Sequence, residues 1–66
     1  MEYTNTQMRA LILEHLHSAR DREILQRRLI DGITFEALAE EFDMSERQIK
    51  NIVYKAERVL FKHIPG

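Results

Sequence analysis

Residues 34–60 read TFEALAEEFDMSERQIKNIVYKAERVL, and the apolar side chains in this stretch recur at helical spacing. Leu38, Ala39 and Phe42 lie at the three- and four-residue steps that bring side chains onto one face of a helix. The spacing is then interrupted at residues 43–44. It resumes with five apolar side chains further along the chain: Ile49, Ile52, Val53, Ala56 and Leu60. The stretch therefore predicts a short helix, a tight turn and a longer helix.

The longer helix is expected to begin after Ser45, because a serine side chain can accept a hydrogen bond from the first turn of a helix. The first two turns of this helix then carry five polar side chains: Glu46, Arg47, Gln48, Lys50 and Asn51. Asp43 is expected in the turn with a left-handed backbone, which Asp tolerates better than most residues do. Two helices joined in this way, with polar side chains at the start of the second, predict a helix-turn-helix.

Two further helices are predicted before this motif, and each has a capping signal. Thr4 and Gln7 are spaced for a capping box, and Ser18 and Asp21 have the same spacing. Gly32 is expected to end the second helix in the left-handed conformation. The sequence thus predicts one all-α, four-helix domain over residues 1–66, with helices at about 6–17, 19–31, 35–42 and 46–62 and a C-terminal helix-turn-helix.

The first two helices raise two expectations about side chains. Leu13 widens the apolar stripe of the first helix, which indicates either burial between neighbouring helices or a patch left for a partner protein. Glu23 and Arg27 are four residues apart on the second helix, so they are expected to pair weakly on its exposed face.

The composition is that of a small globular protein without disulfides. The 66 residues include no cysteine, and 44% of them are hydrophobic and 32% charged. No apolar run is long enough to span a bilayer, and no signal peptide is visible. A chain without thiols fits a reducing compartment, so we expect a cytoplasmic protein that does not bind membranes.

The charge is divided unevenly along the chain. The net charge is −1, but residues 1–44 carry five basic and nine acidic side chains, whereas residues 45–66 carry five basic and two acidic ones. A surface that binds DNA needs a local positive potential rather than a basic chain as a whole. The positive charge falls on the predicted last helix, which favours that helix as the DNA-binding element.

The polar side chains at the start of this helix have the donors and acceptors that read base edges in the major groove. Arg47 can donate two parallel hydrogen bonds to guanine, Gln48 can bracket adenine, and Glu46 can accept from cytosine. Base readout is therefore expected from Glu46, Arg47, Gln48, Lys50 and Asn51. Contacts to the DNA backbone are expected from Thr34, Ser45, Lys55, Arg58 and Lys62, through either charged side chains or the N–H groups at a helix start.

The order of features from Arg20 to Leu60 resembles region 4 of sigma-70-type RNA polymerase sigma factors. The resemblance rests on residues 22–25 (REIL), 28–32 (RLIDG), Thr34, 38–42 (LAEEF), 44–45 (MS), 49–52 (IKNI) and 55–60 (KAERVL). It covers about two-thirds of the chain without a gap. Region 4 often has glycine where Asp43 stands and leucine where Phe42 stands, and neither departure threatens the fold.

The resemblance implies that the last helix reads a promoter −35 element and that the domain contacts the β-subunit flap of the polymerase core. The bases read are expected to differ from the housekeeping pattern, because the identities at the five reading positions differ from it. No segment resembles the region 2 that melts the promoter. The chain is therefore expected to be a stand-alone region 4-like protein or a fragment of a longer one.

Other classes of function stay open on the sequence. A LuxR-type regulator has a similar rhythm in its DNA-binding helix, and a protein-interaction module is the alternative that needs no DNA, with Tyr3, Leu13, Phe61 and Ile64 as its apolar contacts. A homodimer is a further alternative, because small DNA-binding proteins often bind paired half-sites. We expect no enzyme, metal or cofactor, since His15 and His17 point to different sides of a helix and no phosphate-binding glycine loop is present.

Overall fold

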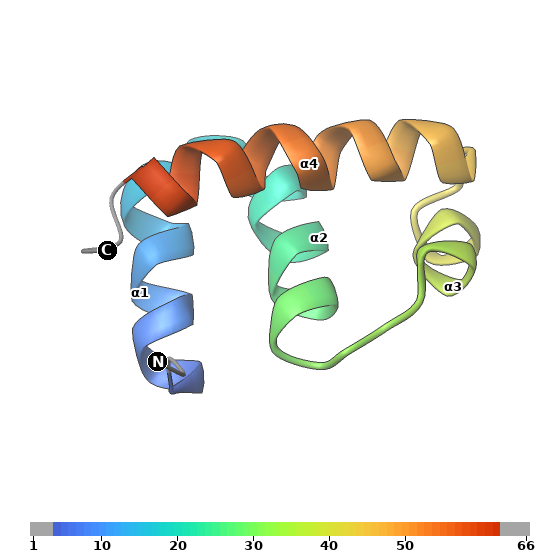
Figure 1. The fold of residues 1–66 in the computed structure, drawn as a ribbon. Coiled ribbons are helices and arrows are strands. Elements are labelled where there is room, and N and C mark those ends of the chain that lie inside the picture. Colours follow the sequence, from blue (N-terminus) through green and yellow to red (C-terminus); the bar gives the residue numbers. More distant parts are fainter. Residues whose placement is uncertain (1–3, 63–66) are drawn as a thin grey trace.

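A computed structural model of the chain describes residues 4–62, which form four α-helices and no strand. In chain order these are α1 (Asn5–His15), α2 (Ala19–Leu29), α3 (Phe35–Glu41) and α4 (Glu46–Lys62). Helices α1 and α2 run side by side in opposite directions, and α4 lies across their ends (Figure 1). Helix α3 contacts the first half of α4 on the other side of α2. The predicted all-α fold with a C-terminal helix-turn-helix is confirmed.

The core lies where α4 meets the other three helices. Helix α4 contacts α1, α2 and α3, and it supplies four of the nine buried apolar side chains. The nine are Ile12, Leu16, Ile24, Leu25, Leu38, Ile49, Val53, Ala56 and Leu60. Because most helical stability in proteins comes from the packing of an apolar face, the burial of one face against three helices is what stabilises α4.

Helix α1 is shorter at its C-terminal end than the predicted 6–17. It begins with the expected capping box, in which Thr4 Oγ1 accepts from the Gln7 N–H at 3.1 Å and Gln7 Oε1 accepts from the Thr4 N–H at 2.9 Å. It ends at His15 because Leu16 turns into an extended conformation. The guanidinium of Arg22 on α2 donates to the Leu16 and Leu13 carbonyl oxygens, which have lost their helical partners at this end. This contact with α2 satisfies the carbonyl oxygens at the point where the helix ends before the predicted residue.

Helix α2 also ends earlier than the predicted 19–31. Its start is as expected, with Ser18 Oγ accepting from the Asp21 N–H at 3.3 Å. At the other end, the N–H groups of Ile30 and Asp31 both donate to the Gln26 carbonyl, which loosens the last turn. Gly32 then takes the expected left-handed conformation, at φ 71°. A hydrogen bond from the Ile33 N–H to the Arg27 carbonyl at 3.1 Å then closes the turn around Gly32.

The turn between α3 and α4 has the predicted left-handed residue. Thr34 Oγ1 caps α3 by accepting from the Ala37 N–H at 3.1 Å, and the helix ends at Glu41, one residue before the predicted end. Asp43 has φ 54°, and the Met44 N–H donates to the Ala39 carbonyl at 2.9 Å. These are the hydrogen bond and backbone of a Schellman motif, which reverses the chain within a few residues. The motif sets the position from which α4 starts.

In the first half of the chain the expected pair of Glu23 and Arg27 is wrong, and of the two alternatives for Leu13 only the patch for a partner protein stays open. Arg27 does not pair with Glu23; its guanidinium instead donates to Glu41 on α3 and to Asp31. Leu13 does not extend the core, because its side chain is 48% exposed on the outer side of α1. For Arg27 the contact with a second helix decided the outcome, and the spacing within one helix does not contain that information.

Candidate nucleic-acid interface

The start of α4 is held by a second capping box. Ser45 Oγ accepts from the Gln48 N–H at 3.1 Å, and Gln48 Oε1 accepts from the Ser45 N–H at 3.0 Å. The Ser45 hydroxyl also lies 3.3 Å from the same Oε1. Both lone pairs of the Gln48 carboxamide oxygen are thus directed at Ser45. The box orients the first turn of α4, and it engages the oxygen that Gln48 would need to bracket an adenine.

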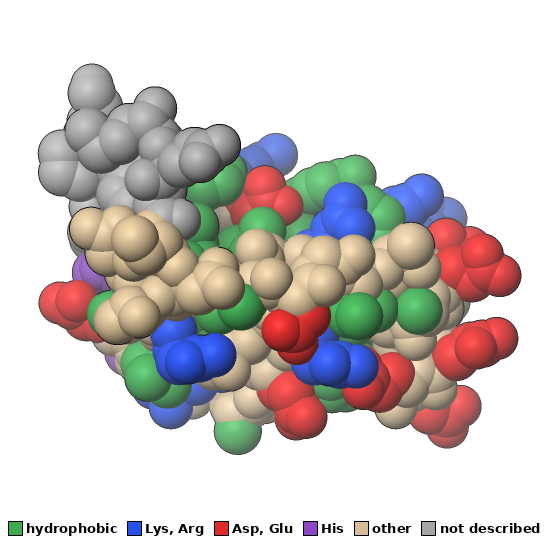
Figure 2. Space-filling model, turned by 90° about the horizontal axis from the view of Figure 1, so that it is seen from below, with side chains coloured by type: hydrophobic (Ala, Val, Ile, Leu, Met, Phe, Trp, Pro, Cys, Tyr) green, Lys and Arg blue, Asp and Glu red, His purple; other side chains and the backbone are tan. Residues whose placement is uncertain are grey.

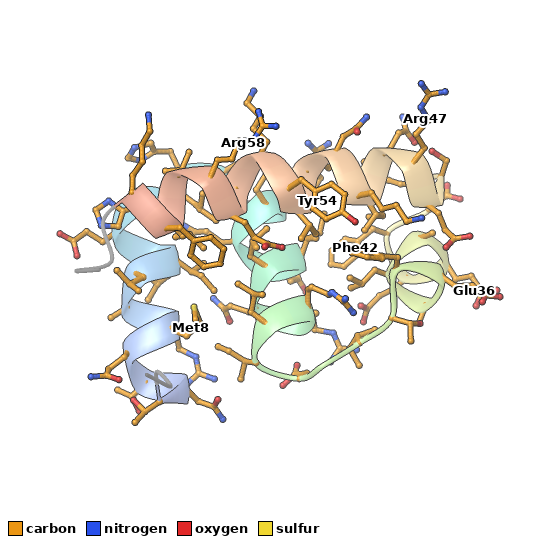
Figure 3. The ribbon with its side chains drawn as sticks, viewed as in Figure 1. Met8, Glu36, Phe42, Arg47, Tyr54 and Arg58 are labelled. Atoms are coloured by element: carbon orange, nitrogen blue, oxygen red, sulfur yellow. The ribbon has the colours of Figure 1, made fainter. Side chains whose placement is uncertain are left out.

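One face of α4 is free of the core along its whole length. Ile49, Val53, Ala56 and Leu60 are buried against the other helices, so the opposite side of α4 faces outward. An outward stripe follows at helical spacing: Arg47, Asn51, Tyr54 and Arg58. All four side chains are exposed, and Arg47 and Arg58 project away from the body of the molecule (Figure 3).

The five predicted base readers do not share one face. At about 100° per residue, Glu46 and Gln48 lie about 160° apart around the axis of α4, as do Gln48 and Lys50. Arg47 and Asn51 lie within the outward stripe. Glu46 and Lys50 lie on the flank of the stripe nearer to α3, where Lys50 Nζ is 5.7 Å from the centre of the Phe35 ring. The structure thus brings Arg47 and Asn51 together, with Glu46 and Lys50 beside them, and leaves Gln48 on the other flank.

The predicted backbone contacts divide into two groups. Lys55, Arg58 and Lys62 are exposed on the second half of α4, with Arg58 in the stripe and the two lysines on its Gln48 side. Thr34 and Ser45 are exposed at the starts of α3 and α4, and each hydroxyl is engaged in capping its own helix. The three cations therefore extend the stripe, while the two hydroxyl residues act first as caps.

Opposite charges are concentrated on neighbouring elements. Between Thr34 and Glu46 the chain carries five acidic side chains and no basic one, whereas residues 47–62 carry five basic side chains and one acidic one. Seen from the side opposite α4, acidic side chains gather at the end of the molecule formed by α3 (Figure 2). On the helix-turn-helix the basic side chains therefore lie on α4 and the acidic ones on α3 and the turn before α4.

Tyr54 and its surroundings were not among the predicted site residues. The Tyr54 side chain is 51% exposed, and its ring meets Phe35 of α3 edge to face, with ring centres 5.9 Å apart and planes at 76°. The guanidinium carbon of Arg28 lies 4.1 Å from the centre of the same Phe35 ring. The seven-residue spacing from Arg47 to Tyr54 was available in the sequence, but the contact with Phe35 joins two helices and was not.

The described residues give no support for metal binding. Among residues 4–62, no three His, Asp or Glu side chains lie close enough together to hold a metal ion. The His15 side chain is 19% exposed, and its Nε2 lies 4.0 Å from Glu14 Oε2. His63, Tyr3 and Ile64 lie outside the described residues. No helix in the described part of the chain is long and apolar enough to cross a membrane.

A short helix, a Schellman turn and a longer helix with an exposed cationic stripe define a DNA-binding helix-turn-helix domain. The family model "Sigma-70, region 4" matches residues 12–62, which is most of the chain. The chain therefore belongs to the sigma-70 region 4 family, whose members act in transcription by binding DNA through a helix-turn-helix. This family is not an enzymatic one, and the match favours it over the LuxR-type alternative. Searches of curated proteins and of solved structures found no match.

Proposed function

We propose that this domain reads a promoter −35-like element in the major groove with the first half of α4. The observation that carries the proposal is the exposed stripe with Arg47 and Arg58 on the side of α4 opposite its buried face. Helix α4 has 17 residues and is roughly 25 Å long at 1.5 Å per residue, which is enough to cross a major groove. Its first turns, where Arg47 lies, are the part that enters the groove in helix-turn-helix proteins.

Within this proposal the reading residues have unequal roles. Arg47 and Asn51 lie centrally, so they supply the main hydrogen bonds to base edges, with Arg47 suited to guanine and Asn51 to adenine. Glu46 and Lys50 lie at the α3 flank and reach bases at the edge of the site. Gln48 has to release its hydrogen bonds with Ser45 before it can bracket an adenine. We infer that the cap holds Gln48 in place unless the DNA offers a better partner.

The backbone contacts follow from the positions of the remaining cations. Lys55, Arg58 and Lys62 lie on the half of α4 that rises out of the groove, where phosphates are the nearest DNA groups. The N–H groups at the starts of α3 and α4, next to Thr34 and Ser45, are the other candidates for phosphate contacts. These contacts supply affinity without sequence information, because every phosphate is alike.

We also infer contact with the polymerase core, on the ground of family membership alone. This leaves a module that binds polymerase without DNA as the second candidate function, favoured by the acidic side chains that flank the stripe. Nothing in residues 4–62 supports the homodimer. A cytoplasmic location follows from the proposed function, since DNA and the polymerase are there.

The test is a selection of preferred duplexes from a random pool with the purified domain, followed by titration of the best duplex at several salt concentrations. A single direct motif is expected. If about four phosphates are neutralised, log K should fall against log salt concentration with a slope near −4. Binding that does not respond to salt, or no enrichment of any duplex, would reject DNA readout by α4. Retention of the polymerase core by a domain that binds no duplex would establish the interaction module instead.

A further inference from the structure

Tyr54 lies midway along the outward stripe of α4, on the edge of the stripe nearest to α3. It follows Arg47 by seven residues, which places it about 20° from Arg47 around the helix axis, on the same side and two turns further on. Asn51 and Arg58 flank it at three and four residues. A surface that brings Arg47 and Asn51 to base edges therefore brings the Tyr54 ring to the same groove.

The Tyr54 ring is held in place from the α3 side. Its edge-to-face contact with Phe35 at 5.9 Å is a geometry that aromatic pairs favour. Phe35 is itself half-buried against the core, and the Arg28 guanidinium over its ring is fixed by a hydrogen bond from Nη1 to the Ile33 carbonyl at 3.0 Å. Tyr54 is thus an exposed aromatic side chain with a fixed orientation, in contrast to the long flexible cations around it.

A fixed apolar ring in the major groove can pack against one apolar group of the bases. The donors and acceptors of the base edges suit Arg47 and Asn51, whereas the C5-methyl group of thymine is the apolar feature that distinguishes this base in the groove. We propose that Tyr54 is a specificity-determining residue that packs its ring against a thymine methyl group, with Phe35 as the residue that positions it. This inference rests on the proposed function and adds a residue and a base to it.

The experiment compares thymine with deoxyuridine in the duplex obtained by selection. Deoxyuridine keeps the base pair with adenine and lacks only the methyl group, so each thymine of the duplex is replaced in turn and affinity is measured by fluorescence anisotropy. For the unaltered protein we expect one position at which the replacement weakens binding about fourfold, the equivalent of ~0.8 kcal/mol for one buried methyl group. At that position Tyr54→Ala should bind thymine and deoxyuridine equally, while Tyr54→Phe should keep the preference.

Phe61→Ala is the matched control, because Phe61 is an aromatic residue of the same helix that is also 51% exposed. It lies seven residues beyond Tyr54, outside the first half of α4, and its loss should leave the preference for thymine unchanged. Phe35→Leu should reduce the preference without abolishing binding, as a positioning role requires. Far-UV circular dichroism establishes that each variant keeps its helices.

The experiment distinguishes a failure of the role of Tyr54 from a failure of the proposed function. An unaltered protein that binds a selected duplex but shows no thymine-sensitive position, or the same sensitivity after Tyr54→Ala, overturns the role of Tyr54 alone. An unaltered protein that binds no duplex rejects the proposed function, and the role of Tyr54 with it.

Discussion

Arg27 on α2 binds Glu41 on α3 through two parallel hydrogen bonds, from Nε to Oε2 at 3.1 Å and from Nη2 to Oε1 at 2.9 Å. Its third nitrogen, Nη1, donates to Asp31 Oδ2 at 3.1 Å. The hydrogen bonds and charge of Glu41, and then those of Asp31, raise the pKa of Arg27 above its ordinary value. The pair joins the first helix of the helix-turn-helix to the scaffold helix before it.

Glu41→Gln should lower the melting temperature at low salt, because the amide keeps the shape of the carboxylate but loses its charge and one acceptor. The loss should shrink at about 1 M salt, where charges are screened over about 3 Å. Thermal unfolding followed by circular dichroism measures both effects. Glu40→Gln is the matched control, since Glu40 is the neighbouring acid on α3 and has no ion pair among the described residues. Equal losses for the two variants would show that the Arg27 pair contributes nothing specific.

Substitution should affect stability differently at the two left-handed residues, Gly32 and Asp43. Gly32→Ala should destabilise the domain by about 1 kcal/mol, because an L-residue is strained at φ 71°. This cost is purely conformational, since a Cβ at Gly32 would meet no atom within 4 Å. Urea unfolding gives the free energy, and an unchanged midpoint for this variant would contradict the backbone argument.

Asp43→Gly should leave stability unchanged or raise it by up to about 1 kcal/mol, because glycine relieves the strain at φ 54° but is more flexible in the unfolded chain. The substitution also removes one negative charge next to the start of α4. Asp43→Val is the control, and it should be clearly destabilising because a β-branched residue is a poor fit to a positive φ. A Val variant as stable as the Gly variant would show that this turn is not what positions α4.

Gln48→Glu separates capping from base readout. A glutamate at this position can complete the capping box, so the free energy of unfolding should stay unchanged. A carboxylate cannot donate to adenine N7, so a loss of preference at one adenine would identify Gln48 as a reader. We expect Gln48→Glu to select the same DNA motif as the unaltered protein. Ser45→Ala provides the reference for the cap and should cost roughly 0.5–2 kcal/mol in urea unfolding.

Arg47→Ala should weaken binding by about 1–3 kcal/mol and relax specificity at one base pair. Affinities for a set of duplexes that differ at single positions measure both effects. The reason is that Arg47 is the cation of the outward stripe nearest to the start of α4.

Arg58→Ala is the matched comparison for Arg47→Ala, since the same side chain is removed eleven residues further along the stripe. It should weaken all duplexes alike and reduce the salt slope by about 1, as the loss of one phosphate contact does. A base-specific effect of Arg58→Ala would place the groove along the second half of α4 instead of the first.

The four helices and the turn between the last two could be predicted from the sequence, because their signals are local. Side chains at three- and four-residue steps, Thr or Ser before each helix start, and residues suited to positive φ at Gly32 and Asp43 all act within a few positions. The exposed side of α4 follows from the same periodicity. Arg47, Asn51 and Arg58 could therefore be placed on it without any knowledge of the packing.

The partners of the side chains depend on how the helices pack and could not be predicted in this way. Arg22 on α2 binds the carbonyl oxygens at the end of α1, and Arg27 binds Glu41 rather than Glu23, because each of these contacts joins two helices. The contact between Phe35 and Tyr54 likewise joins residues 19 positions apart. Local spacing thus determined which side of α4 is exposed. The crossing of α3 and α4 determined that Tyr54 packs against Phe35, because this contact comes from outside the helix that carries Tyr54.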